Sequence, residues 1–335
     1  MIRALDRGGL AAGAAVTLLL AAGLWLGSRN LRNYDPVLLT YTFGVLFSAF
    51  GVAYRFAVWL RRPPTRLLLR RGWLLFRAGR AGAATRAAAV NLGAQAFLRK
   101  RGFLRWFAHA CIAWGCLLAG AVTFPLVFGW LHFDVLPDAP RIYVVKLFDV
   151  AVGRFDADSP VRHVLFNLLN LSAVLVIVGA GLALRRRLRD PGTLARQQFG
   201  NDLLPLLLLL AISFTGLLLT FSMHALHGAG YREISLLHAF TVVAALLYVP
   251  YGKFFHVVQR PLHVASVLHR TEAEAGPRVA CRRCGDRFAG EAQLEDLRRA
   301  TAESGFALDL DVCPRCKRLA PAVAQAHAIA EARGG

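Results

Sequence analysis

Six long apolar segments alternate with polar and charged stretches along this chain of 335 residues. They cover residues 9–27, 37–60, 104–131, 163–184, 202–222 and 236–257. A helix of roughly 20 apolar residues crosses the hydrocarbon core of a bilayer. The first segment has no convincing small-residue cleavage site after Gly27, so we interpret it as a helix and not as a signal peptide. The pattern predicts an all-α integral membrane protein with a bundle of about six transmembrane helices.

The charges between these segments predict the orientation of the bundle. Residues 61–105 carry twelve basic residues and no acidic one, and the loop at 185–196 carries five arginines against one aspartate. The loop at 132–162 contains five aspartates instead. Because basic loops stay in the cytoplasm, we expect both termini in the cytoplasm and the acidic loop outside.

The composition narrows the class of protein. The chain is 56% hydrophobic, yet its formal net charge is +20. Such a charge could indicate nucleic-acid binding, but here it lies in blocks between apolar segments, which indicates membrane topology. We therefore expect no nucleic-acid partner. The bias toward arginine and alanine is typical of a GC-rich bacterial genome, so the expected location is the bacterial cytoplasmic (inner) membrane.

One stretch between the second and third apolar segments combines apolar and basic residues. Residues 73–76 read Trp-Leu-Leu-Phe among arginines. This pattern is typical of an amphipathic helix that lies on the membrane surface among lipid headgroups, and a solvated basic loop explains it equally well.

His109, His238 and His256 lie within the apolar segments, where ionisable groups are costly and usually functional. His238 and His256 are eighteen residues apart, so a straight helix would present both on one face, about 27 Å apart. Two stacked haems would use such a helix. His109 and His256 are both expected near the cytoplasmic interface, where they could bind one haem iron from two sides. The alternative is two independent polar residues at the membrane boundary.

The segment from His238 to His256 resembles the last helix of a known family. Pro250 follows the first histidine by twelve residues, and the basic residue Lys253 precedes the second. This signature resembles the membrane cytochrome b (gamma) subunit of respiratory nitrate reductase and the related membrane subunits of heterodisulfide-reductase-like proteins. His109, with Trp114 shortly after it, resembles the ligand-bearing earlier helix of that family. The resemblance covers roughly residues 37–260.

The resemblance implies haem b, with one or two haems, and oxidation of a quinol, either menaquinol or ubiquinol. It also implies electron transfer to a cytoplasmic iron–sulfur or molybdopterin oxidoreductase subunit. One position departs from the family, because Ala119 stands where the second ligand of the earlier helix is expected. A distal haem on His238 would therefore need another ligand. Four further histidines lie at the expected outer ends of helices: His132, His163, His224 and His227.

His224 and His227 are the nearest of these to His238 in sequence. They could bind iron, bind quinone or face water. A single haem is also possible, with His238 serving the quinone. Arg105 and Lys253 each lie one turn before a histidine and could pair with haem propionates. Anchoring at the membrane boundary explains these two basic residues equally well.

Four cysteines near the end of the chain form two CxxC pairs. Cys281 and Cys284 are separated from Cys313 and Cys316 by twenty-eight residues. Two such pairs supply four thiolates to a tetrahedral metal, and zinc is the first choice. A redox-active iron, as in rubredoxin, is the alternative. The intervening residues 290–305 predict a helix, which favours a small zinc-ribbon-like module.

We expect three parts in the chain. Residues 1–36 form an extra N-terminal transmembrane helix, residues 37–260 a five-helix cytochrome b-like membrane domain, and residues 261–335 a cytoplasmic tail with the four-cysteine module. The expected function is that of a haem b membrane anchor and electron-transfer subunit. Quinol oxidation is the only reaction expected of it, and we assign no catalytic residue. The alternatives are a membrane transporter and a haem-free membrane adaptor whose zinc-ribbon tail binds a partner.

Overall fold

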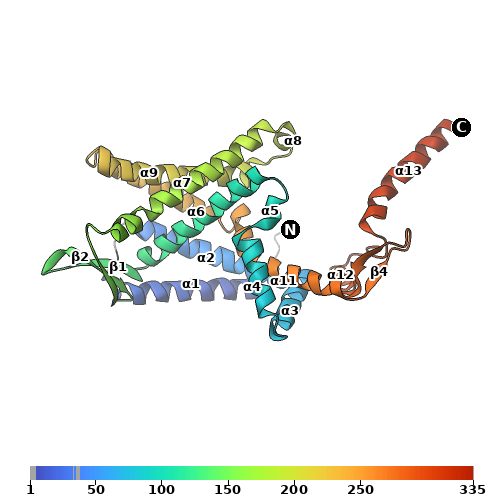
Figure 1. Ribbon diagram of the computed structural model, residues 1–335, viewed down its shortest axis with the longest axis horizontal. Coiled ribbons are helices and arrows are strands. Elements are labelled where there is room, and N and C mark those ends of the chain that lie inside the picture. Colours follow the sequence, from blue (N-terminus) through green and yellow to red (C-terminus); the bar gives the residue numbers. More distant parts are fainter. Residues whose placement is uncertain (1–4, 33, 35–37, 335) are drawn as a thin grey trace. The chain divides into compact units, whose positions relative to one another are not determined.

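The computed structural model describes residues 5–32, 34 and 38–334, and helices dominate it (Figure 1). The chain divides into two compact units. The first, which we call the membrane unit, contains Met1–Ala57 and Ala94–Val258. The second, which we call the cysteine unit, contains Val58–Gly93 and Gln259–Gly335.

The membrane unit holds most of the apolar helices. Its helices are α1 (Arg7–Gly27), α2 (Leu39–Leu60, whose last three residues belong to the cysteine unit), α5 (Ala96–Arg99), α6 (Phe103–Val127), α7 (Pro160–Arg189), α8 (Pro191–Leu194), α9 (Leu204–Ala225) and α10 (Tyr231–Tyr248). Among the described residues, five helices are long and apolar enough to cross a membrane, and α10 with the following helix makes a sixth if that bent pair is one span. The predicted helical membrane bundle is confirmed.

The last predicted span is broken in the structure. α10 ends at Tyr248, and a short 3-10 turn at Lys253–Phe255 precedes α11 (His256–Ala275). Pro250 lacks a backbone N–H and its ring clashes with the preceding turn, so a helix does not continue through it undisturbed. The expectation that His238 and His256 share one face of a straight helix is therefore wrong.

The acidic loop between α6 and α7 contains three strands, which the sequence analysis did not predict. They are β1 (Leu131–Leu136), β2 (Ala139–Leu147) and β3 (Val150–Asp156), paired antiparallel in that order. Figure 1 shows this sheet at the end of the helices opposite α5 and α8. Within the membrane unit, the acidic segment thus lies at the end opposite the basic residues of 94–105 and 185–196.

The sheet region is joined to α1 by specific contacts. The Trp130 ring nitrogen donates to the Gly23 carbonyl over 3.0 Å, and Arg29 pairs with Asp149. A Cβ at Gly27 would lie only 2.3 Å from the Trp130 ring. The first helix is therefore packed into the unit, although the family resemblance does not include it.

α6 and α7 pack through small residues. A Cβ at Gly179 would lie 2.5 Å from the Ala108 carbonyl oxygen and 2.9 Å from the Cys111 side chain. A Cβ at Gly115 would likewise meet Val176 at 2.7 Å. Membrane helices associate closely where small residues let their backbones approach, because lipid tails leave no hydrophobic driving force between them.

We expect Gly179→Ala to destabilise the membrane unit by about 1–3 kcal/mol, because the added methyl meets backbone that cannot rotate away. Thermal unfolding of the purified protein in detergent measures this effect. Gly181→Ala is the matched control, since nothing lies within 4 Å of a Cβ at that position. Equal melting temperatures for the two variants would contradict the close packing of α6 on α7.

The cysteine unit combines the basic segment after α2 with the C-terminal tail. Its elements are α3 (Pro63–Arg77), α4 (Ala81–Ala88), most of α11, β4 (Arg278–Ala280), β5 (Arg287–Gly290), α12 (Glu291–Glu303) and α13 (Pro314–Gly334). α12 confirms the helix predicted at 290–305. The tail packs with Val58–Gly93, a segment that the sequence analysis had placed in the membrane domain.

Candidate functional site

Two of the predicted histidines lie next to each other in the membrane unit. His109 is near the start of α6 and His256 begins α11. Their ring centroids are 6.4 Å apart, and the ring planes are inclined by 64°. When two imidazoles bind the same metal ion from opposite sides, each through a nitrogen at about 2 Å, their ring centroids are about 6 Å apart. The spacing is therefore compatible with one haem iron between the two rings.

The hydrogen bonds of both rings select the nitrogen that would face a metal. His109 Nδ1 lies 2.7 Å from Gln95 Oε1, and His256 Nδ1 lies 2.6 Å from the Lys253 carbonyl oxygen. A carbonyl oxygen only accepts, so each Nδ1 carries the hydrogen and each Nε2 carries the lone pair. Such outer hydrogen bonds fix the tautomer and raise the basicity of a ligating histidine.

Gln95 was not predicted as a site residue. Its side chain is only 5% exposed, and its backbone has a φ of 51° in the left-handed region. A non-glycine residue in this region costs free energy and persists where the surroundings hold it. The hydrogen bond to His109 is one such restraint.

A cluster of contacts fixes the break that precedes His256. The Arg55 guanidinium donates to the Pro250 carbonyl over 2.7 Å and lies over the Phe255 ring, 4.2 Å from its centroid. Phe255 is almost fully buried. A Cβ at Gly51 would lie 2.6 Å from Pro250. The second helix therefore holds the backbone just before His256.

Tyr248 holds the other side of the break. Its hydroxyl donates to the Gly200 carbonyl over 2.6 Å, and the Lys253 backbone N–H lies 3.2 Å from the same hydroxyl. The ring covers Gly252, where a Cβ would lie 1.9 Å from it. Only glycine fits there, and the position of His256 depends on this fit.

His238 is half-buried on α10 and contacts α9, apart from the break. Its Nδ1 lies 2.9 Å from Thr215 Oγ1, and that hydroxyl donates to the Ala211 carbonyl over 2.7 Å. The hydroxyl has one hydrogen, so it accepts from Nδ1, and the lone pair of His238 is on Nε2. Gly216 faces the ring, and a Cβ at this position would lie 3.4 Å from His238 Cε1.

Among the described residues, no hydrogen bond or ion pair joins His238 to the four other candidate histidines. His224, near the end of α9, and His227, in the turn after it, are exposed. His132 pairs with Asp149 at 3.3 Å, and His163 approaches the Ser159 carbonyl in the first turn of α7. A second ligand opposite His238 is thus not identified.

The two basic residues proposed for haem propionates differ in their surroundings. Lys253 Nζ lies 2.8 Å from an Asp202 carboxylate oxygen, and Arg187 lies 3.3 Å from the same oxygen. Arg105 is exposed on the first turn of α6, within electrostatic reach of Arg186. Lys253 therefore already has a carboxylate partner, whereas Arg105 lies in a field of like charge.

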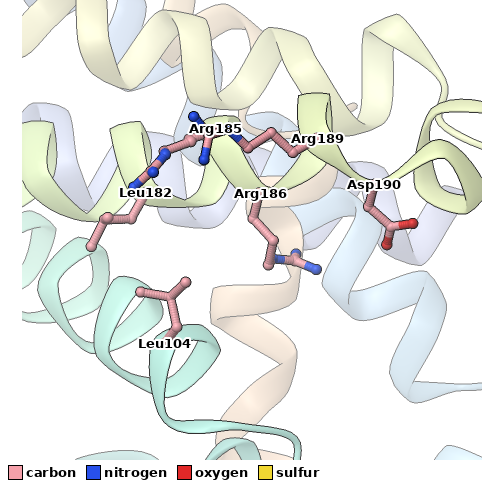
Figure 2. Close-up of a pocket in the computed structure, with 6 residues that line it drawn as sticks. All are labelled: Leu104, Leu182, Arg185, Arg186, Arg189 and Asp190. Carbon is pink, nitrogen blue, oxygen red and sulfur yellow. The ribbon is translucent and has the colours of Figure 1, made fainter.

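A basic pocket lies between the start of α6 and the end of α7, and Figure 2 shows its lining. Leu104 of α6 faces Leu182 of α7, and Arg186 extends toward the same side. The pocket has a volume of about 380 Å³ and is lined by Leu104, Leu182, Arg185, Arg186, Arg189 and Asp190. Such a lining combines apolar surface with guanidinium groups and suits an anionic group on an apolar molecule.

The four C-terminal cysteines converge in the cysteine unit. Their sulfur atoms all lie within 4.8 Å of one another, and the Cys284 and Cys313 sulfurs are 3.8 Å apart. A tetrahedral zinc with sulfur at about 2.3 Å requires sulfur–sulfur distances of about 3.8 Å. The predicted four-cysteine cluster is confirmed, and its geometry fits a metal ion such as zinc.

Backbone N–H groups turn toward the sulfurs, as in metal-binding knuckles. Cys281 Sγ accepts from the Cys313 N–H at 3.2 Å and from the Arg283 N–H at 3.4 Å. The Cys316 N–H donates to Cys313 Sγ at 3.4 Å. Gly285, with a φ of 73°, lets the first knuckle close.

Contacts within the cluster separate the pKa values of Cys281 and Cys316. The Cys313 backbone N–H lowers the pKa of Cys281 to about 6, while the sulfurs of Cys284 and Cys313 raise the pKa of Cys316 to about 12. Four thiolates at this spacing repel one another. A dication offsets this repulsion, so the donor set fits a divalent metal bound by four deprotonated cysteines.

No protein-family model, curated protein or solved structure matches this chain.

Proposed function

We propose that this chain is the haem b-containing membrane anchor and electron-transfer subunit of a quinol-linked oxidoreductase. It oxidises quinol in the membrane and passes the electrons to a cytoplasmic iron–sulfur or molybdopterin subunit. The observation that carries the proposal is the 6.4 Å separation of the His109 and His256 rings, each oriented through its Nδ1 by a carbonyl oxygen. The resemblance of the sequence around both histidines to nitrate reductase gamma subunits supports it.

His109 and His256 would hold one haem b through their Nε2 atoms. When bound, the haem supplies a carrier for one electron at a time. Gln95 and the Lys253 carbonyl hold the two Nδ1 hydrogens, which keeps both rings in the ligating tautomer. Arg55 stabilises the break that places His256 opposite His109.

In this proposal, His238 accepts a hydroxyl hydrogen from the quinol. Oxidation of a quinol releases two electrons and two protons, so a site needs an acceptor for a hydroxyl hydrogen. The Nε2 lone pair of His238 provides one, because Thr215 holds the hydrogen on Nδ1. The alternative is a second haem on His238, with His224 or His227 as the other ligand. The number of haems per chain decides between them: one haem supports the quinol role, and two support the alternative.

We further propose that the four-cysteine site holds zinc and that the chain resides in a bacterial cytoplasmic membrane with both termini inside. The charge distribution supports this orientation, since the acidic loop and the basic residues of 94–105 and 185–196 lie at opposite ends of the membrane unit. The helical insert α12 between the knuckles supports zinc over a rubredoxin-like iron.

A reduced-minus-oxidised spectrum with a pyridine haemochrome assay tests the proposal on the full chain. We expect a b-type alpha band, and we expect the haem to be extractable, because the sequence contains no CxxCH for covalent attachment. Protein purified without haem from haem-replete cells would favour a transporter or a haem-free adaptor instead.

Partner docking gives a separate prediction. The basic segments 61–105 and 185–196 favour an acidic partner surface. Gentle purification from the native host should recover a soluble redox subunit. Raising the salt concentration should weaken the association, because surface attraction is screened over about 8 Å at physiological ionic strength. A chain that purifies alone at low salt would contradict this expectation.

A further inference from the structure

The outer face of α3 carries an apolar stripe that the cysteine unit does not cover. Leu69, Trp73 and Phe76 lie on one side of this helix and are all exposed, Trp73 to 60%. The Trp73 and Phe76 rings are stacked with their centroids 6.0 Å apart. Exposed aromatic clusters of this kind mark interaction surfaces.

Arginines flank the stripe on one side. At 100° per residue, Arg70 and Arg77 lie beside Leu69, Trp73 and Phe76 on the helix surface. The segment 61–93 contains eight arginines and no acidic residue. An apolar face bordered by basic residues that extend toward water suits the headgroup region of an anionic bilayer.

The side of α3 that carries Arg71 and Gly72 packs against the rest of the cysteine unit. Arg71 makes two hydrogen bonds, of 2.8 and 2.9 Å, to the Asp296 carboxylate of α12. Asp296 is 2% exposed and also lies 3.1 Å from His269. A Cβ at Gly72 would be 2.6 Å from that of Ala265. These contacts tie α3 to α11 and to α12, the helix between the two cysteine pairs, so the stripe and the metal module belong to one compact unit.

Chain continuity keeps the start of α3 close to the end of α2. α3 begins at Pro63, and α2, a membrane-spanning helix, ends at Leu60. Three residues span at most about 10 Å, so the start of α3 stays within the interfacial layer of the bilayer that α2 crosses.

We propose that α3 binds the anionic phospholipid surface through Leu69, Trp73 and Phe76, with Arg70 and Arg77 on the headgroups, and thereby holds the four-cysteine module against the membrane. The occupant is the lipid of the cytoplasmic leaflet. This role needs no haem, so it is independent of the electron-transfer function.

Fluorine NMR of the full chain in nanodiscs tests the proposal. The protein is labelled with 5-fluorotryptophan, and the Trp73 resonance is assigned by its loss in Trp73→Phe. In discs of phosphatidylglycerol and phosphatidylcholine, we expect doxyl-labelled lipid to broaden this resonance and a water-soluble gadolinium chelate to leave it sharp. Trp114, exposed on the transmembrane helix α6, serves as the internal control for lipid contact.

A second experiment tests the contribution of Arg70 and Arg77. Each basic residue near an anionic surface favours the bound state about fivefold, so Arg70→Gln with Arg77→Gln should lower the bound-to-released ratio of α3 about 25-fold. Arg86→Gln on α4 is the matched control. Discs of phosphatidylcholine alone should weaken the lipid contact of the wild-type chain in the same way.

Two results would overturn the assignment of α3 to the lipid surface. Both require protein with one metal ion per chain, so that the four-cysteine module is known to be intact. A Trp73 resonance broadened by gadolinium and untouched by doxyl lipid would show a water-exposed face. A resonance protected from both agents would show that protein covers the stripe, either another part of this chain, a second copy or a partner subunit.

Discussion

His109→Ala and His256→Ala are each expected to remove the b-type spectrum of the purified protein. Loss of one of two axial ligands leaves the iron held from one side only. Changes to groups that merely support a ligand lower metal affinity about 10- to 100-fold, so loss of the ligand itself should cost at least that much. Haem per chain, measured by pyridine haemochrome on protein of equal purity, gives the result.

Three controls separate ligand loss from misfolding. His163→Ala removes an exposed histidine at the other end of the membrane unit and should keep the full haem content. Glycine variants of His109 and His256 should regain the spectrum when imidazole is added, which a misfolded chain would not. Gln95→Leu should retain some haem with weakened affinity, because only the hydrogen bond to Nδ1 is lost. A full haem complement in both alanine variants would exclude this pair as ligands.

Cys284→Ser and Cys313→Ser are expected to release the metal and unfold residues 278–320, with the haem spectrum unchanged. A small segment buries too little core to be stable alone, and a structural zinc contributes about 10–16 kcal/mol of apparent binding free energy. Elemental analysis measures the metal, and hydrogen exchange of β4, β5 and α12 measures the folding. Cys116→Ser on α6 is the matched control, because that thiol is far from the cluster in sequence and should leave the metal in place.

The metal content per chain tests whether the four-cysteine site holds zinc or iron. One zinc per chain and a colourless cysteine unit are expected after aerobic purification. One iron per chain with visible absorbance, and no zinc, would contradict the zinc assignment. In that case the cysteine variants should also slow electron transfer to the partner.

The apolar segments predicted five spans closely, because a helix in lipid must satisfy its own backbone and its length follows from the bilayer. The sixth predicted span is present as a bent pair of helices, and the break after Tyr248 was not predicted. Pro250 and Gly252 stand at this break, but only Pro250 entered the prediction, as part of a family signature, and Gly252 was given no role. Their physical meaning is a helix end, and the short turn that follows is what supplies the Lys253 carbonyl to His256.

Other features depend on contacts that no local pattern encodes. Gln95 lies in a connecting segment, and only the tertiary structure places its amide on His109. The strands of the acidic loop had a local signal, because three of the four residues Ile142–Val145 are β-branched. The loop was interpreted from its charges, so this signal was not used. The partnership of α3 with α12 joins residues 225 positions apart, beyond the reach of periodicity.

The anchoring of α1 on the outer sheet also has a consequence for biosynthesis. The hydrogen bond from Trp130 to Gly23 joins residues 107 positions apart, and the pair Arg29–Asp149 joins residues 120 apart. At about 5–20 residues per second, a ribosome needs several seconds to add that much chain. The first helix can pack on α2 early, since Gly13 lies against Phe50 and the Asp6 N–H donates to the Tyr54 hydroxyl, but its contacts with the sheet form only after β1–β3 have been synthesised. Chains that stall within this interval therefore hold α1 by its contacts with α2 alone, and its sheet-facing end around Gly23 and Arg29 lacks its final partners.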